Sequence, residues 1–370
     1  MRILVISNMF PTKETPAFGI FVKNQVTSLI EHGYTVHVAA IQDPEMGKFH
    51  VLKKYSSWLL GSMRRLLTAG KSYDVVHAHY AFPSGMIARW FKKWANVPYV
   101  VTCHGGDLNK MAKKGPFFRK QTEKILKDAD HVITVGHDLE RQVTEEYGLS
   151  KTKVSVLSMG VNRNVFFSQE KTAIRNKLDV NENLTNLLFV GNIIKEKGME
   201  DLIQALSIIK KQDPTIHLHV VGQAKQESYL QFLHERIKEL QIEETVTFHG
   251  PKTQKEVAEW MNAADIFVLP SHIEGFGLVA VEAMACGTPV VGTDTGGLSY
   301  LLKGDTGSLA VPKSPSSIAE AINRVTEDDN YRQHLISNGK QKAAQNDSST
   351  ITDRVITIYE EAMEKTGESK

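Results

Sequence analysis

Short runs of β-branched and other apolar residues alternate along the chain with longer stretches whose apolar positions recur every three or four residues. The short runs predict buried strands, and the longer stretches predict amphipathic helices. In the first half, strands are expected at residues 2–7, 35–41, 75–78, 99–103, 132–135 and 154–157. Strands that are apolar throughout and alternate with helices are typical of a parallel sheet covered on both faces.

The second half repeats this rhythm, with strands expected at residues 187–190, 217–221, 245–248, 266–269 and 290–292. The polar segment 168–185 predicts a linker. We therefore predict an α/β protein with two doubly wound, Rossmann-like domains, at 1–168 and 186–349. A C-terminal helix at 350–370 is expected to return to the first domain. Two such domains should face a cleft at the carboxyl ends of their strands, where these folds bind ligands.

Composition excludes several classes of protein. The 370 residues carry a net charge of +2 and are 41% hydrophobic, which excludes a disordered chain, a collagen-like fibre and a disulfide scaffold. The two cysteines, Cys103 and Cys286, lie far apart in the chain and suit a reducing compartment. No apolar run reaches the roughly 18 residues of a membrane-spanning helix, and the N-terminus resembles a strand more than a signal peptide. We expect a cytoplasmic protein.

Charge is distributed unevenly between the two halves. Residues 1–170 hold 23 Lys and Arg against 14 Asp and Glu, whereas residues 171–370 hold 21 against 28. Basic residues alternate with aromatic and apolar ones at 53–67, 89–94 and 110–120. Such stretches suit an anionic membrane surface, which would make the protein peripheral on the inner face of the cell membrane. A buried aromatic core with a solvated basic rim explains them equally well. No nucleic-acid-binding motif is present, so nucleic acid is not expected as a partner.

The segment 270–297, PSHIEGFGLVAVEAMACGTPVVGTDTGG, carries the clearest chemical signal. A strand ends near its start, a turn follows with Glu274, Gly275, Phe276 and Gly277, and a helix begins at about Leu278. Glycines at such a turn let a ligand approach the backbone closely. The free N–H groups and the positive dipole end of the helix then favour a diphosphate.

Two glutamates flank this turn. Glu282 lies about one turn into the helix, and its side chain leans back toward the helix N-terminus. A carboxylate in this place suits the hydroxyls of a ribose, while Glu274 could reach a hydroxylated group on the other side of the phosphates. This spacing predicts recognition of a sugar, a diphosphate and a ribose. The alternative is a helix-capping Glu274 and an exposed Glu282.

The segment resembles the signature of the retaining glycosyltransferases of family four, which have the GT-B fold of two Rossmann-like domains. Residues 187–206 are similar to the donor-diphosphate loop of that family, and residues 248–271 to the helix and strand that precede its paired glutamates. Residues 100–108 resemble its first-domain loop, and residues 9–38 its opening glycine loop and helix. The resemblance extends over nearly the whole chain.

The resemblance implies a role for each matching residue of the second domain. Glu282 would bind the nucleotide ribose, and Glu274 would hold hydroxyls of the donor sugar. Gly275, Phe276, Gly277 and Leu278 would offer backbone N–H groups to sugar and phosphate.

The remaining implied site residues lie on other loops. Lys197 would neutralise the leaving diphosphate, His104 would lie beside the transferred sugar, and Gly19 would give the backbone room near the diphosphate. One position departs from the family pattern, since Asn192 stands where an arginine is usual. Lys195 is a candidate substitute for that missing cation.

No metal or cofactor is expected. Asp128-Ala129-Asp130 has the letters of a metal-binding pair, but it lies at a helix end and is interpreted as structural. A helix dipole and a lysine would take the place of a metal ion. His77 and His79, which alternate along a strand, are also interpreted as structural.

The resemblance implies a retaining, metal-independent hexosyltransferase. It would move a sugar from a nucleotide-sugar, with UDP the expected carrier, to a glycan or lipid-linked acceptor. Similar enzymes build bacterial surface polymers such as teichuronic acid or capsule. A non-catalytic nucleotide-sugar-binding protein remains an alternative. An NAD-dependent dehydrogenase is disfavoured, because no G-x-G-x-x-G follows the first strand.

Overall fold

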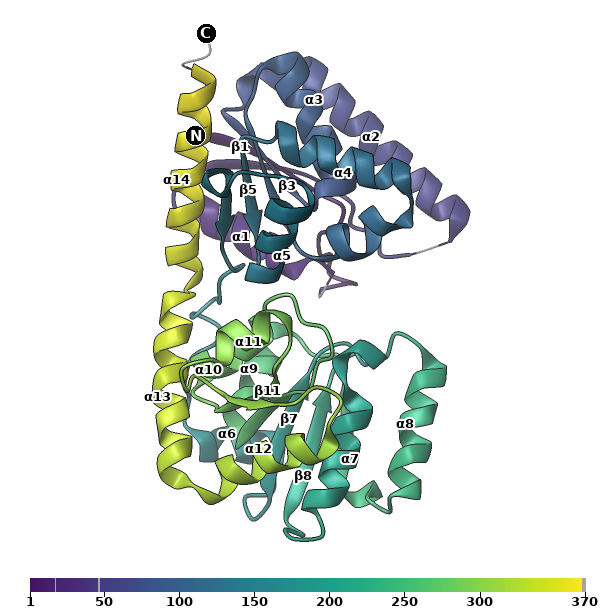
Figure 1. Cartoon of the computed structure of the whole chain (residues 1–370), viewed down its shortest axis with the longest axis vertical. Coiled ribbons are helices and arrows are strands. Elements are labelled where there is room, and N and C mark those ends of the chain that lie inside the picture. Colours follow the sequence, from purple (N-terminus) through teal and green to yellow (C-terminus); the bar gives the residue numbers. More distant parts are fainter. Residues whose placement is uncertain (17, 46, 368–370) are drawn as a thin grey trace. The chain divides into compact units, whose positions relative to one another are not determined.

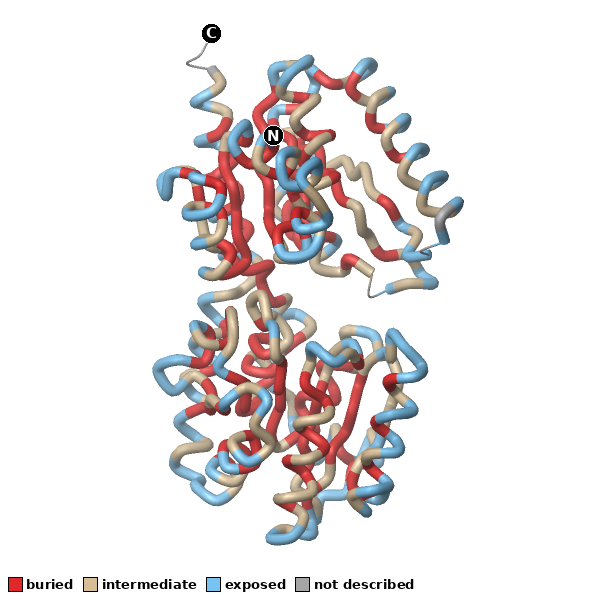
Figure 2. Tube along the Cα trace, turned by 45° about the vertical axis from the view of Figure 1, so that its right-hand side comes forward, coloured by how far each residue is buried: buried red, intermediate tan, exposed pale blue. Residues whose placement is uncertain are grey.

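The computed structural model describes residues 1–16, 18–45 and 47–367. The chain forms two units (Figure 1): Met1–Gly160 together with Ser348–Lys370, and Val161–Asp347. Each unit contains a six-stranded parallel sheet with helices packed against it, which confirms the predicted fold class. The strands form the buried centre of each unit, while the outer surfaces of the helices are exposed (Figure 2).

The sheet of the first unit has the strand order β2-β1-β3-β4-β5-β6. Its strands are β1 (Arg2–Ser7), β2 (Thr35–Ala40), β3 (Val75–His79), β4 (Tyr99–Cys103), β5 (His131–Thr134) and β6 (Val154–Val156). Its helices are α1 (Ile20–Glu31), α2 (Lys48–Ala69), α3 (Met86–Ala95), α4 (Pro116–Asp128), α5 (His137–Arg141) and α14 (Ser348–Gly367).

The C-terminal helix α14 belongs to the first unit, as the sequence predicted. It packs beside α1, and both helices contribute apolar residues to one hydrophobic cluster with alternate residues of β1. The Tyr359 ring is fully buried there, and its hydroxyl group bonds His77 Nδ1 at 2.6 Å. The last helix of the chain is therefore part of the core of the first unit.

The sheet of the second unit has the order β12-β11-β10-β7-β8-β9. Its strands are β7 (Thr185–Val190), β8 (Ile216–Val221), β9 (Val246–Gly250), β10 (Ile266–Leu269), β11 (Val290–Thr293) and β12 (Ser308–Ala310). Its helices are α6 (Lys171–Leu178), α7 (Met199–Ile209), α8 (Glu227–Glu239), α9 (Gln254–Ala263), α10 (Leu278–Cys286), α11 (Gly296–Leu302), α12 (Pro315–Glu327) and α13 (Asp329–Gln345).

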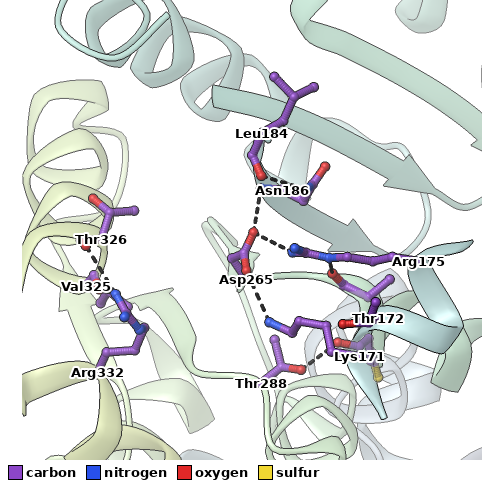
Figure 3. A network of polar contacts seen from close by, with 12 residues as sticks. Lys171, Thr172, Arg175, Leu184, Asn186, Asp265, Thr288, Val325, Thr326 and Arg332 are labelled. Carbon is purple, nitrogen blue, oxygen red and sulfur yellow. Dashed lines mark hydrogen bonds and ion pairs between the residues drawn. The ribbon is translucent and has the colours of Figure 1, made fainter. Parts of the chain in front are cut away.

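The polar segment 168–185, expected to be a linker, instead contains the helix α6 and lies within the second unit. Asp265 holds this helix in place (Figure 3). Its carboxylate accepts hydrogen bonds from Arg175 Nη2 at 2.7 Å, from Lys171 Nζ at 3.1 Å and from the backbone N–H of Asn186 at 2.9 Å. These polar contacts hold α6 in place, whereas the sequence analysis had expected a helix only where apolar residues recur along one face.

Both sheets reverse their strand order at one point. In the first unit the neighbours β1 and β3 continue in opposite directions across the sheet, and in the second unit β7 and β10 do so. Open α/β sheets bind ligands at the carboxyl edge of the sheet, beside the two strands where the order reverses. The loops after β7 and β10 are those that carry Lys197 and Glu274.

Candidate active site

The loops after β7 and β10 lie in direct contact. Gly198 has a left-handed backbone, with φ 68°, and a Cβ atom there would lie 1.9 Å from the Pro270 carbonyl oxygen. The backbone N–H of His272 donates to the Glu196 carbonyl at 2.8 Å. Because only glycine fits at residue 198, the two loops approach more closely than any other side chain would allow.

Lys197 and Glu274 meet where these loops touch. The Lys197 Nζ atom lies 2.5 Å from Glu274 Oε2, and the two side chains are 23% and 14% exposed. The Gly275 N–H donates to the other carboxylate oxygen at 3.2 Å. The structure thus brings together a cation and a carboxylate that the sequence analysis had assigned to neighbouring parts of one ligand.

The helix α10 begins beside this ion pair with an open N-terminus. Gly277 caps it with φ 89°, and a Cβ atom there would lie 2.6 Å from the Leu298 side chain. The Ala280 N–H turns inward to the Gly277 carbonyl at 2.9 Å. In the described part of the chain, no acceptor meets the N–H groups of Phe276, Gly277 or Leu278. These donors and the helix dipole form a site suited to an anion.

Glu282 lies in the second turn of α10 and is half-buried. Across residues 1–16, 18–45 and 47–367, no side chain or backbone group forms a hydrogen bond or ion pair with its carboxyl group. Desolvation raises the pKa of Glu282 to about 8. A carboxyl group in this state lacks the donors that normally accompany burial, and ligand hydroxyls would supply them.

Asn192 and Lys195 are both exposed on the loop after β7. The Lys195 backbone carbonyl accepts from the Gly198 N–H at 3.0 Å, and the ion pair with Glu274 is made by Lys197 instead of Lys195. Lys197 is therefore the cation of this loop that reaches the Glu274 carboxylate. The structure does not bring Asn192 or Lys195 into that contact.

Several residues that stabilise the turn at Glu274 were not predicted from the sequence. The Gly297 N–H donates to the Glu274 carbonyl at 2.9 Å, and a Cβ atom on Gly297 would lie 2.4 Å from the Gly275 carbonyl oxygen. His272 forms an ion pair with Asp201 of α7. The Gly296-Gly297 pair before α11 was the available signal, because paired glycines at a helix start often mark a close backbone approach.

In the first unit, His104 directly follows β4 at the carboxyl edge of the sheet. Its Nε2 atom lies 3.1 Å from His79 Nδ1, and its ring contacts Tyr80 and Phe21 with centroid separations of 4.6 and 4.9 Å. Burial lowers the pKa of His104 to about 3, so the imidazole is neutral near pH 7. His79 orients His104, a role that sequence reasoning missed.

His77 is structural, as predicted. Its two ring nitrogens bond the Tyr359 hydroxyl at 2.6 Å and the Thr102 hydroxyl at 2.7 Å. The His77 and His79 rings stack with a centroid separation of 4.5 Å. A continuous set of contacts therefore runs from α14 through both strand histidines to His104.

Gly19 caps the N-terminus of α1 with φ 74°. A Cβ atom there would lie 2.7 Å from the Met9 carbonyl oxygen, so the packing of the loop after β1 itself requires glycine. Packing within the first unit is therefore enough to explain why residue 19 is a glycine. Its role toward a ligand stays a prediction.

The Asp128 and Asp130 carboxylates are engaged by the protein, in agreement with a structural role. Asp128 pairs with Arg89, and Asp130 accepts from Lys92 Nζ at 2.6 Å and from the Tyr99 N–H at 2.9 Å. Among the described residues, one set has side-chain spacing suited to a metal ion: Asp43 and Glu45, which precede α2, and His50 in its first turn. It lies outside the residues assigned to the donor.

Comparison with protein families gives matches for both units. Residues 19–165 match the family described as Glycosyltransferase Family 4, and residues 170–342 match Glycosyl transferases group 1. The chain is 30% identical over 347 residues to a D-inositol 3-phosphate glycosyltransferase of Streptosporangium roseum, which covers 88% of this chain and 78% of that protein. It is 29% identical over 364 residues to the putative teichuronic acid biosynthesis glycosyltransferase TuaC of Bacillus subtilis, with 88% and 89% covered.

Solved structures share the fold. A sucrose-phosphate synthase from Thermosynechococcus elongatus superposes with a TM-score of 0.82 at 22% identity, over 99% of this chain and all of that one. The Anabaena protein HepE, solved in complex with UDP, gives a TM-score of 0.78 at 22% identity, over 96% and 99% of the two chains.

Proposed function

The chain belongs to the glycosyltransferases of group 1 and Family 4, and from this premise we propose that it moves a sugar from a nucleotide-sugar donor to an acceptor hydroxyl with retention at the anomeric carbon. The contact between Lys197 and Glu274 beside the open N-terminus of α10 is the observation that carries the proposal. A cation, free N–H groups and a carboxylate are the groups needed to hold a diphosphate next to a polyhydroxylated sugar.

In the proposed complex the diphosphate lies at the N–H groups of α10 and draws the Lys197 ammonium toward it. Glu274 then accepts hydrogen bonds from the hydroxyls of the donor sugar, and Glu282 accepts them from the ribose. Glu282 has no other partner in the described residues and is raised in pKa, so binding to ribose would satisfy an otherwise costly group.

During transfer, a bond forms between the acceptor oxygen and the anomeric carbon while the bond from that carbon to the diphosphate breaks. The acceptor proton passes to the leaving phosphate oxygen. Negative charge grows on the diphosphate, so Lys197 and the α10 N-terminus would stabilise the transition state more than the ground state. This proposal requires no metal ion, because these groups supply the positive charge.

His104 would act in this reaction as a neutral hydrogen-bonding group beside the transferred sugar. Because its pKa is lowered to about 3, the His104 imidazole is not protonated near pH 7. His79 fixes the ring through the 3.1 Å contact between the two imidazoles, and one nitrogen of His104 remains for a ligand.

UDP is the proposed carrier and a cell-surface polysaccharide the proposed product. Support for UDP comes from HepE, a protein of the same fold solved with UDP and with UDP-glucose. Support for the product comes from TuaC, whose name places it in teichuronic acid biosynthesis. The D-inositol 3-phosphate glycosyltransferases, at similar identity, make a phosphorylated cyclitol the competing class of acceptor.

The donor is tested by a thermal-shift screen against UDP-, GDP- and ADP-sugars, with and without EDTA. A ligand at 100 times its Kd should stabilise the protein by about 2.7 kcal/mol. Release of nucleoside diphosphate from the stabilising donor then separates an enzyme from a non-catalytic binding protein. Stabilisation without release, with every acceptor class tried, would favour the binding protein, and activity lost in EDTA would contradict metal independence.

We also propose that the first unit contacts an anionic membrane through the outer face of α2. Within the described residues, no helix is both long and apolar enough to cross a bilayer. On α2, Phe49, Leu60 and Leu67 are 90%, 72% and 79% exposed, with the exposed Lys53 and Arg64 among them. Apolar side chains flanked by cations suit the boundary between headgroups and acyl chains.

The structure also removes some of the residues that the sequence had suggested for membrane contact. Trp58 of α2 is buried, and Lys92 is tied to Asp130, so neither is free to meet a bilayer. Replacing Lys53 and Arg64 with Glu should abolish binding to vesicles that contain phosphatidylglycerol, whereas Lys238→Glu on α8 of the second unit should not. Binding that resists both this reversal and high salt would contradict the proposal.

A further inference from the structure

Basic side chains surround a cavity of about 680 Å³ at the amino ends of β5 and β6 in the first unit. They come from α3, α4, the turn before β6 and the end of α14. The six cations are Arg89, Lys92, Lys93, Lys127, Lys153 and Lys365. His104 follows the opposite, carboxyl edge of the same parallel sheet, so this cavity is separate from the proposed catalytic residues.

The two carboxylates that line the cavity are already engaged in the fold. Asp130 bonds Lys92 and the Tyr99 N–H, and Asp128 pairs with Arg89. These contacts fix one wall of the cavity, and Lys127 pairs with Glu123 of α4, but no carboxylate among the described residues forms an ion pair with Lys93 or Lys153. A concentration of positive charge around a surface pocket favours the binding of an anion.

Lys153 shows this excess of charge most clearly. It is half-buried, and its Nζ atom donates to the Lys127 backbone carbonyl at 2.5 Å instead of to a carboxylate. Burial and then the neighbouring Lys92 lower the pKa of Lys153. The hydroxyls of Ser150 and Thr152 line the same space and add donors for an oxyanion.

The last turn of α3 separates this cavity from an apolar groove. Lys92 and Lys93 face the basic cavity, whereas Trp94 lines the groove together with Leu66 and Leu67 of α2. The groove has a volume of about 560 Å³. A phosphate group in the cavity would therefore have apolar surface beside it for any attached hydrocarbon.

We propose that the basic cavity binds the phosphate group of an organic phosphate, as a second ligand site distinct from the donor site. Its volume is in the range of small-molecule sites, and several lysines and an arginine are suited to phosphate oxygens. The ligand is a phospholipid headgroup or a soluble phosphate ester. This inference does not depend on the proposed transfer reaction.

The test uses the full chain and two probes. Glycerol 3-phosphate carries the phosphate alone, and dihexanoyl-phosphatidylglycerol, kept below its critical micelle concentration, adds acyl chains without a bilayer. Binding is followed by calorimetry and by tryptophan fluorescence. Lys93→Glu should weaken binding of the better probe by at least about ten-fold, because it replaces an attractive charge with a repulsive one at an exposed position. Lys153→Gln should weaken it in the same direction.

The matched control is Lys124→Glu, which makes the same charge change at an exposed position of α4 outside the cavity. It should leave the Kd within about two-fold of wild type. Tighter binding of the short-chain lipid, lost in Trp94→Ala, would identify a lipid headgroup, and equal binding of both probes would identify a soluble ester. The proposal is overturned if neither probe binds, or if Lys93→Glu and Lys124→Glu have equal effects.

Discussion

Glu282 illustrates, at the scale of one residue, how a ligand site lowers the stability of the free protein. Its carboxyl group is half-buried, has no partner among the described residues and has a pKa raised to about 8. Near neutral pH, the Glu282 carboxyl group of the folded protein must therefore either take up a proton or remain charged without its full hydration, and both lower the stability of the fold. Glu282→Gln removes this cost and also weakens acceptance of ribose hydroxyls.

We accordingly predict that Glu282→Gln raises the Tm of the second unit in the free protein by about 2–4 °C, the equivalent of roughly 1 kcal/mol in a unit of this size. The same change should raise the donor KM about ten-fold, since a hydrogen bond to a charged group contributes about 1.5–3 kcal/mol. Calorimetry without donor and initial rates with donor check the two parts. A variant that is both less stable and unchanged in KM would refute the ribose assignment.

Lys197 is the second residue whose role can be isolated. Lys197→Ala should lower kcat by about 10²–10³, the scale expected for loss of one preorganised group at a developing anion. Lys195→Ala is the matched control, because Lys195 is two residues away on the same loop and is exposed. Initial rates of nucleoside diphosphate release give the comparison.

Asn192→Arg in the Lys197→Ala background should restore part of kcat, because it returns a positive charge to the loop after β7. Loss of activity in Lys195→Ala but not in Lys197→Ala would show that the residue assignment along this loop is shifted. The contact between Lys197 and Glu274 was not predicted. The sequence contains both residues, but they lie 77 positions apart, and it does not show that their loops meet at the point where the strand order reverses.

At the scale of elements, the sequence predicts those that bury apolar surface and fails for those held by polar contacts. The expected strand 132–135 is β5 at His131–Thr134, shifted by one residue. The helix α6 was missed because its start is capped by the Glu170 side chain and its body is anchored to Asp265. The helix α13 was missed because it is polar over most of its length, although Leu335, Gly339 and Ala343 are buried.

Gly198 connects two elements, since it lets the loop after β7 meet the end of β10. Gly198→Ala would place a methyl group 1.9 Å from the Pro270 carbonyl and strain a left-handed backbone. We predict that it lowers stability by more than 1 kcal/mol. It should also lower kcat, because Lys197 would move away from Glu274.

Gly304→Ala supplies the matched control for this prediction. Gly304 also has positive φ, at 72°, but a Cβ atom there meets nothing within 4 Å. The control separates backbone strain from collision with Pro270. Denaturant unfolding and initial rates on both variants check the prediction, and equal losses in the two would show that the close contact between the loops has no part in the effect.

At the scale of the whole molecule, both units contain histidines that burial keeps neutral. Burial lowers the pKa of His77 and His104 to about 3 and that of His131 to about 4 in the first unit. In the second unit it lowers the pKa of His219 to about 3. An unfolded histidine titrates near 6.5, so below that pH the unfolded chain binds more protons than the folded one. These residues therefore stabilise the fold above pH 6.5, and that contribution is lost as the pH falls toward 3–4.

We predict that the free energy of unfolding decreases from pH 7 to pH 5, at up to about 1.4 kcal/mol per pH unit for each of these histidines. Glu282 acts in the opposite direction, because its raised pKa makes the folded state the better proton acceptor between about 4.5 and 8. Glu282→Gln should therefore make the decrease steeper, while His219→Gln should make it shallower if the variant folds. Urea unfolding at pH 7, 6 and 5 measures all three slopes. Stability that is constant or rises toward pH 5 in the wild type would show that these histidines are protonated in the folded protein, and His104 could then no longer be treated as a neutral group in the proposed transfer reaction.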